Sequence, residues 1–325
     1  MDKTMKLRRH AWTAVLAAIA VAAVVLGVVF RGGIADMFSE FGRYLSHTFF
    51  RRALIVGLAV SLCAALLGVC LVLKRYSMIG DGLSHVGFGA LAIAMALGYV
   101  GAESAFYDVA HAISRRPIVF TTVVVMLLAF ALLRLNGSSR IKGDAAIAIL
   151  STGALALGII VVSVTEGMNI DISNYMFGSI FAVDAGDVKY ALIMSAVVAV
   201  LFILSYNQIF AVTFDETFSQ ATGVKTGLFN MLLAALTAVT IVMGMRLMGT
   251  MLISSLVIFP ALTSMRVFSR FRLVVAASAV ISVVCFLMGL MLSCLYNLPA
   301  GAAVVGMNVI LFVVFHIIGK VRGIR

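Results

Sequence analysis

The sequence predicts an all-α protein, a polytopic bundle of transmembrane helices. Of its 325 residues, 63% are hydrophobic and only 11% are charged, whereas soluble globular domains are about 45–50% apolar and about 25% charged. A soluble chain of this size could not bury so much apolar surface, so its solvent is lipid. The net charge of +11 does not indicate nucleic-acid binding, because Lys and Arg lie between apolar runs, as the positive-inside rule expects.

The apolar runs set the number of expected spans. A helix needs about 20 apolar residues to cross about 30 Å of hydrocarbon. Runs of that size with few or no charges lie at 11–30, 53–73, 82–102, 117–133, 145–165, 190–210, 226–245 and 247–265. The last uncharged stretch, 273–319, is interrupted by Asn297-Leu298-Pro299, and the residue before a proline avoids helix. We therefore expect two helices there, about ten spans in all, and a short re-entrant or half-helix element at 172–183.

Charges at the N-terminus give an orientation. Four basic residues precede the first run and place the N-terminus in the cytoplasm: Lys3, Lys6, Arg8 and Arg9. We expect residues 1–50 to form an additional membrane anchor with an interfacial segment, and residues 51–325 to form the main transmembrane domain. The four cysteines lie in apolar runs without CxxC spacing and are expected to be packing residues.

Asp81 and His85 are the first functional candidates, because ionisable groups inside a bilayer are costly. They lie four residues apart, on one face of a helix. A carboxylate oxygen and an imidazole nitrogen can then converge on one cation, a pair that suits zinc, manganese or ferrous iron better than magnesium or calcium. If the helix starts near Lys74 and Arg75, His85 lies about 15 Å deep, near the midplane.

A second reading of the pair stays open. Asp81 could cap the N-terminus of the helix while His85 bonds to a neighbouring helix. Two ligands are also too few for a metal site, so other helices, water or a symmetry mate must supply more. The surrounding glycines fit either close helix packing or a flexible pore-lining element; they are Gly80, Gly82, Gly87 and Gly89.

The cytoplasmic loop 207–225 carries signals for a short helix. Asp215 and Glu216 are early carboxylates that suit the positive end of a helix dipole, and Gly223 is a stop signal. With Phe218 between them, they form a segment that fits docking onto another protein, or an ordinary solvated loop. The chain has no G-x-x-x-x-G-K-[ST] sequence, so it has no P-loop of its own.

Asp171 precedes the short apolar run at 172–183, which we expect at the outer mouth of the pathway. A segment too short to cross is tolerated at membrane depth only where protein or a water-filled cavity surrounds it. Asp171 then either offers an oxygen to incoming cations or caps the short helix.

Several segments together resemble the permease family of bacterial zinc, manganese and iron ABC importers. They follow the family's order and spacing from about residue 50 to the end. The similar segments are Arg75-Tyr-Ser-Met-Ile-Gly-Asp81-Gly-Leu-Ser-His85, Asp171-Ile-Ser-Asn-Tyr-Met-Phe-Gly-Ser-Ile, Thr213-Phe-Asp215-Glu216 with Gly223, the run Gly249 to Pro260-Ala, and Tyr296-Asn-Leu-Pro299-Ala-Gly.

The resemblance implies a multi-pass permease of the bacterial cytoplasmic membrane. It implies a second, identical permease chain, a separate cytoplasmic ATPase on each coupling helix, and an extracytoplasmic metal-binding protein. By this resemblance, the family's pore ligands correspond to Asp81 and His85. Its coupling helix, which contacts the ATPase, corresponds to the segment with Asp215, Glu216, Phe218 and Gly223. The chain itself is then not an enzyme and holds no permanent cofactor, since the divalent metal is its cargo.

The residues alone leave the identity of the metal open, and they leave two other classes of function open as well. The segment Ser151-Thr152-Gly153 and the Tyr-Met-Phe-Gly-Ser-Ile run resemble zinc permeases most, with manganese or iron as alternatives. A secondary transporter would use an ion gradient and need no ATPase. An intramembrane enzyme would use Asp81 and His85 as a catalytic pair and turn over without partners.

Overall fold

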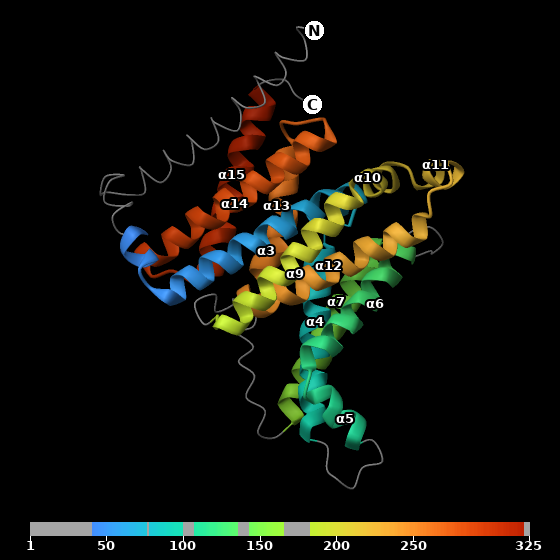
Figure 1. Cartoon of the computed structure of the whole chain (residues 1–325), viewed down its shortest axis with the longest axis vertical. Coiled ribbons are helices and arrows are strands. Elements are labelled where there is room, and N and C mark those ends of the chain that lie inside the picture. Colours follow the sequence, from blue (N-terminus) through green and yellow to red (C-terminus); the bar gives the residue numbers. More distant parts are fainter. Residues whose placement is uncertain (1–40, 77, 100–106, 136–142, 166–182, 322–325) are drawn as a thin grey trace. The chain divides into compact units, whose positions relative to one another are not determined.

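The computed structural model describes residues 41–76, 78–99, 107–135, 143–165 and 183–321. Within these ranges every regular element is helical (Figure 1), which confirms the all-α prediction for this part of the chain. The longer helices are α3 (Thr48–Leu73), α4 (Ile79–Ala96), α6 (Pro117–Leu135), α7 (Gly143–Val164), α9 (Ala185–Leu204), α12 (Thr226–Met248), α13 (Thr250–Met265), α14 (Phe271–Tyr296) and α15 (Ala300–Val321). The short ones are η1 (Leu97–Tyr99), α5 (Tyr107–Ser114), α10 (Tyr206–Phe214) and α11 (Glu216–Ala221).

The expected number of about ten spans is not confirmed. Among the described residues, seven helices are long and apolar enough to cross a membrane, and the pair α5 and α6, bent by 92°, makes an eighth if it is one span. The run 247–265 forms only the 16-residue α13, which at 1.5 Å per residue reaches about 24 Å and is short for a full crossing. The expected elements at 11–30 and 172–183, and most of the anchor 1–50, lie outside the described residues.

The expected break in the long uncharged stretch 273–319 is present. Helix α14 ends at Tyr296 and α15 begins at Ala300, so the long uncharged stretch is two helices, as Asn297-Leu298-Pro299 predicts. Asn297 has a positive φ of 54° and closes α14 in the left-handed conformation. The loop at 207–225 is more helical than expected, because α10 continues almost directly from α9 and occupies its first half.

One compact unit contains α14, α15 and most of α3. Its helices approach closely at small residues: an added Cβ on Gly57 would overlap the ring of Phe286, which is fully buried. Hydroxyl groups add bonds between α14 and α3, since Ser282 Oγ donates to the Ser61 carbonyl at 2.9 Å and Ser278 Oγ to the Ala65 carbonyl at 3.3 Å. Small residues and cross-helix hydroxyl bonds are how helices associate in lipid, where the hydrophobic effect gives little drive.

The other unit contains α4, α5, α6, α7, α10, α11 and α12, and α4 is packed by α6, α7 and α12. Glycines make these contacts possible. An added Cβ would overlap Ile147 of α7 at Gly82, Met245 of α12 at Gly87, and the backbone of Ala154 of α7 at Gly89. Of the two roles considered for these glycines, the structure supports packing at these three positions.

Candidate functional site

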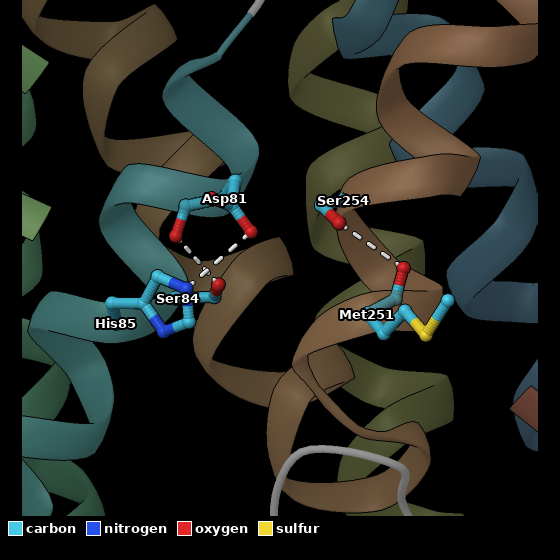
Figure 2. Close-up of polar contacts among 5 residues, drawn as sticks. All are labelled: Asp81, Ser84, His85, Met251 and Ser254. Carbon is cyan, nitrogen blue, oxygen red and sulfur yellow. Dashed lines mark hydrogen bonds and ion pairs between the residues drawn. The ribbon is translucent and has the colours of Figure 1, made fainter. Parts of the chain in front are cut away.

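Asp81 and His85 face each other on the first turns of α4. The distance from His85 Nε2 to Asp81 Oδ1 is 3.5 Å, and Figure 2 shows the two side chains pointing toward one another. The His85 side chain is 15% exposed and that of Asp81 is 45% exposed in the single chain. The predicted convergence of one carboxylate and one imidazole on the same side of α4 is therefore present.

The start of α4 bears on the capping alternative. The helix begins at Ile79, and its N-cap is Met78, whose side chain makes no capping bond. Asp81 is thus the third residue of the helix, in its first turn, where a carboxylate benefits from the positive end of the dipole. Asp81 therefore does not occupy the capping position, and its carboxylate contacts His85.

The pair is an incomplete ligand set by itself. Within the described ranges, no group of three or more His, Cys, Asp or Glu side chains gathers where it could hold a metal. Asp171, the other predicted oxygen ligand, lies outside those ranges. The first turn of α13 carries Met251 and Ser254, whose hydroxyl donates to the Met251 carbonyl at 3.1 Å (Figure 2).

The position of His85 is fixed by the packing of α4. Gly82 and Gly89 lie within four residues of His85 on either side. An added Cβ would overlap a side-chain methyl of Ile147 at Gly82 and the Ala154 backbone at Gly89. Ser84 is fully buried, and its hydroxyl donates to the Asp81 carbonyl at 2.7 Å. These close approaches leave little room for α4 to shift against α7, so packing holds the helix that carries His85.

The predicted short helix is present as α11. Asp215 is its N-cap, and Asp215 Oδ1 accepts a hydrogen bond from the backbone N–H of Phe218 at 2.8 Å. At the other end, the N–H of Val224 donates to the Ser219 carbonyl and that of Gly223 to the Gln220 carbonyl, with φ of 85° at Gly223. This is the Schellman arrangement, which needs a left-handed residue. Phe218 is 65% exposed, so the capped helix presents an apolar ring.

A cavity of about 920 Å³ lies between α11, the first turn of α12 and the turn that joins α3 to α4. Lys74 Nζ donates to Asn230 Oδ1 at 2.6 Å, and Asn230 Nδ2 donates to Glu216 Oε1 at 2.9 Å. Burial lowers the pKa of Lys74 from its usual value, and the Glu216 carboxylate partly opposes this shift. Burial and, less strongly, the same carboxylate raise the pKa of Tyr76 to about 12, so its hydroxyl stays protonated and donates to the Leu132 carbonyl at 3.0 Å.

Sequence reasoning missed Lys74 and Asn230. Lys74 was noted only as a mark of the membrane interface, and Asn230 was included in an apolar run. An amide in the first turns of an otherwise apolar span was the available signal, because polar groups there are expensive unless they are paired. Its two partners come from segments far apart in the sequence, which no local pattern shows.

The profile of the ABC 3 transport family matches residues 46–319. The chain belongs to this family. It is 26% identical over 287 residues to the manganese transport system membrane protein MntC of Halalkalibacterium halodurans, covering 87% of this chain and 92% of that protein. It is 29% identical over 261 residues to the high-affinity zinc uptake system membrane protein ZnuB of Haemophilus influenzae, covering 80% of this chain and 94% of that protein.

A solved structure agrees with this membership. The structure described as PsaBC from Streptococcus pneumoniae in complex with Fab superposes with a TM-score of 0.69 at 27% identity, covering 87% of this chain and 95% of that one. The ABC 3 family member described here is therefore a multi-pass membrane protein of a metal importer family, as the resemblance implied.

Proposed function

We propose that this chain is the permease subunit of an ATP-driven importer of a divalent metal ion, with zinc as the cargo. The observation that carries the proposal is the Asp81–His85 pair, held by glycine packing on the first turns of α4. An oxygen and a nitrogen ligand suit a borderline cation, and two ligands bind weakly enough for a transported ion to leave. The coordination is completed by water, by other helices or by the second permease chain.

The choice of zinc rests on sequence resemblance and on ligand chemistry. Zinc binds mixed N/O sites more tightly than manganese or ferrous iron in the Irving–Williams order. The relatives carry names for both manganese and zinc transport, so a manganese or iron importer of the same family is the alternative. Uptake of radioactive zinc in competition with manganese and ferrous iron separates these cargos.

The energy source is a separate ATPase subunit that docks on α11. The helix is capped at both ends and presents Phe218 to solvent, and the sequence contains no P-loop. A metal-binding protein on the outer side and a second copy of this chain complete the assembly. The lipid bilayer surrounds the spans, and no role for nucleic acid is proposed.

The test is metal uptake by the complex reconstituted in proteoliposomes with its ATPase and binding protein. Asp81→Ala and His85→Ala should abolish ATP-dependent zinc uptake, because each removes one of the two ligands that α4 provides. Ser84→Ala is the matched control: it lies between the two and removes only a hydrogen bond within the helix. Normal uptake by His85→Ala would remove His85 from the pathway.

The other two function classes predict different results in the same assay. A secondary transporter would take up metal in vesicles that contain this chain alone and an ion gradient. An intramembrane enzyme would convert a substrate without the ATPase or the binding protein. Metal uptake that needs neither ATP nor partners would overturn the importer proposal.

A further inference from the structure

Backbone hydrogen bonds close the turn that follows α3. The N–H of Tyr76 donates to the Leu71 carbonyl at 2.9 Å and that of Arg75 to the Val72 carbonyl at 3.0 Å, with φ of 63° at Arg75. This Schellman arrangement makes Lys74 the C-cap that directly follows α3. The N–H of Ile79 then donates to the Tyr76 carbonyl at 3.2 Å, so the first residue of α4 is bonded to the same turn.

The Lys74 side chain leaves this turn toward α12 and α11. Its ammonium group contacts the amide oxygen of Asn230, and the amide nitrogen of Asn230 contacts the carboxylate of Glu216, the first residue of α11. A cation needs an acceptor and a carboxylate needs a donor, and an amide offers one of each. Asn230 therefore joins two opposite charges through two charge-assisted hydrogen bonds, which are stronger than neutral ones.

The three residues of this bridge line the cavity described above. Helix α11 packs against α10 and α12, whereas the cavity of about 920 Å³ separates it from the turn that begins α4. The polar bridge thus runs along the cavity wall from the exposed docking helix to the segment seven residues before Asp81.

We propose that Lys74 and Asn230 are positioning residues that couple the docking helix α11 to the metal-carrying helix α4. The inference rests on the proposed function. When the ATPase moves α11, Glu216 pulls on Asn230 and Lys74, and the hydrogen bond from the Ile79 N–H to the Tyr76 carbonyl carries this displacement to the start of α4 and the Asp81–His85 pair. Packing also connects the two helices through α12, which contacts both α11 and α4, and the bridge adds a polar connection from Glu216 to the turn before α4.

The experiment measures zinc transported per ATP hydrolysed in proteoliposomes that contain the complete complex. Asn230→Leu keeps the approximate size of the side chain but removes both bonds, and Lys74→Met removes the cation. Each should lower the ratio by roughly two- to thirtyfold, the range found for residues that carry coupling between sites. Neither residue lies on α11, so copurification of the ATPase and its hydrolysis rate should stay within about twofold of wild type.

The double variant Lys74→Met with Asn230→Leu decides whether the two act as one bridge. The effects of substitutions within one network are not additive. The double variant should therefore have a zinc-to-ATP ratio no lower than that of the more severely affected single variant. Lys74→Arg, which still donates to the Asn230 oxygen, should keep most of the wild-type ratio. Tyr76→Phe is the matched control, because it removes a bond from the same turn that leads to α6 instead of α11.

The possible failures are distinguishable. Wild-type complex without ATP-dependent zinc uptake would overturn the proposed function itself. Wild-type uptake together with an unchanged ratio in Asn230→Leu, fully additive losses in the double variant, or an equal loss in Tyr76→Phe would overturn the coupling role alone.

Discussion

The contact between α4 and α7 sets where His85 sits, and it can be perturbed by single methyl groups. A Cβ added at Gly158 would lie 2.9 Å from the Gly89 Cα and 2.9 Å from two ring carbons of Phe88. A Cβ added at Gly89 would lie 3.1 Å from the Ala154 carbonyl carbon and would overlap its oxygen. Carbon atoms pack best at about 3.5–4.0 Å, so either alanine must push the helices apart by several tenths of an ångström.

The expected cost follows from two opposing contributions. Overpacking a well-packed interface costs about 1–3 kcal/mol, whereas replacing a helical glycine by alanine stabilises by about 0.5–1 kcal/mol. Gly153 isolates the gain from replacing a helical glycine by alanine. It lies on α7, as Gly158 does, but a Cβ added there meets nothing within 4 Å. The free energy of unfolding should therefore be about 1–3 kcal/mol lower for Gly89→Ala than for Gly153→Ala.

The assay is equilibrium unfolding in mixed micelles with increasing SDS, followed by zinc uptake of each variant in proteoliposomes. Because Gly89 is one turn from His85, Gly89→Ala should also reduce uptake, while Gly153→Ala should not. If Gly89→Ala proves as stable as Gly153→Ala, the close approach of α4 and α7 does not exist in the membrane and the argument for a fixed His85 fails.

Two further predictions concern the turn residues and the helix cap. Arg75→Gly should stabilise the protein by about 1 kcal/mol and Gly223→Ala should destabilise it by about the same amount, because both positions have a positive φ that only glycine adopts freely; thermal unfolding in detergent measures both, and shifts of the same sign would contradict the assignment. Asp215→Ala should cost about 0.5–2 kcal/mol at the start of α11 and weaken copurification of the ATPase, since the Phe218 N–H loses its acceptor. Asp215→Asn keeps a capping oxygen and should bind the ATPase normally, so equal losses in both variants would show that the charge matters and the cap does not.

Much of the candidate site was predictable because it depends on local spacing. The separation of Asp81 and His85 by four residues places them on one face of any helix, and the structure has them 3.5 Å apart. The early carboxylates and the Gly223 stop of α11 were likewise predicted and are present, and the structure adds that Asp215 is the N-cap. These features need only the helical repeat and the chemistry of helix ends.

The number of spans predicted from hydropathy is not confirmed by the described residues. Hydropathy treats any apolar run of suitable length as a crossing, but α13 is too short and α5 and α6 meet at 92°. The start and the bend of an apolar helix depend on residues with positive φ, such as Gly249 with φ of 91°, and on neighbouring helices. A count of apolar residues along the sequence includes no information on backbone conformation or on neighbouring helices.

The sequence by itself determined that this protein is helical, membrane-embedded and equipped with a carboxylate–imidazole pair, because composition and helical periodicity act over a few neighbouring residues. Only the tertiary structure decided which glycines let α4 approach α7 and that Lys74, Asn230 and Glu216 form one bridge. Asn230 lies 156 residues after Lys74, and such distant groups meet only when helix packing brings their ends together. Their partners are therefore set by the fold and not by any local pattern.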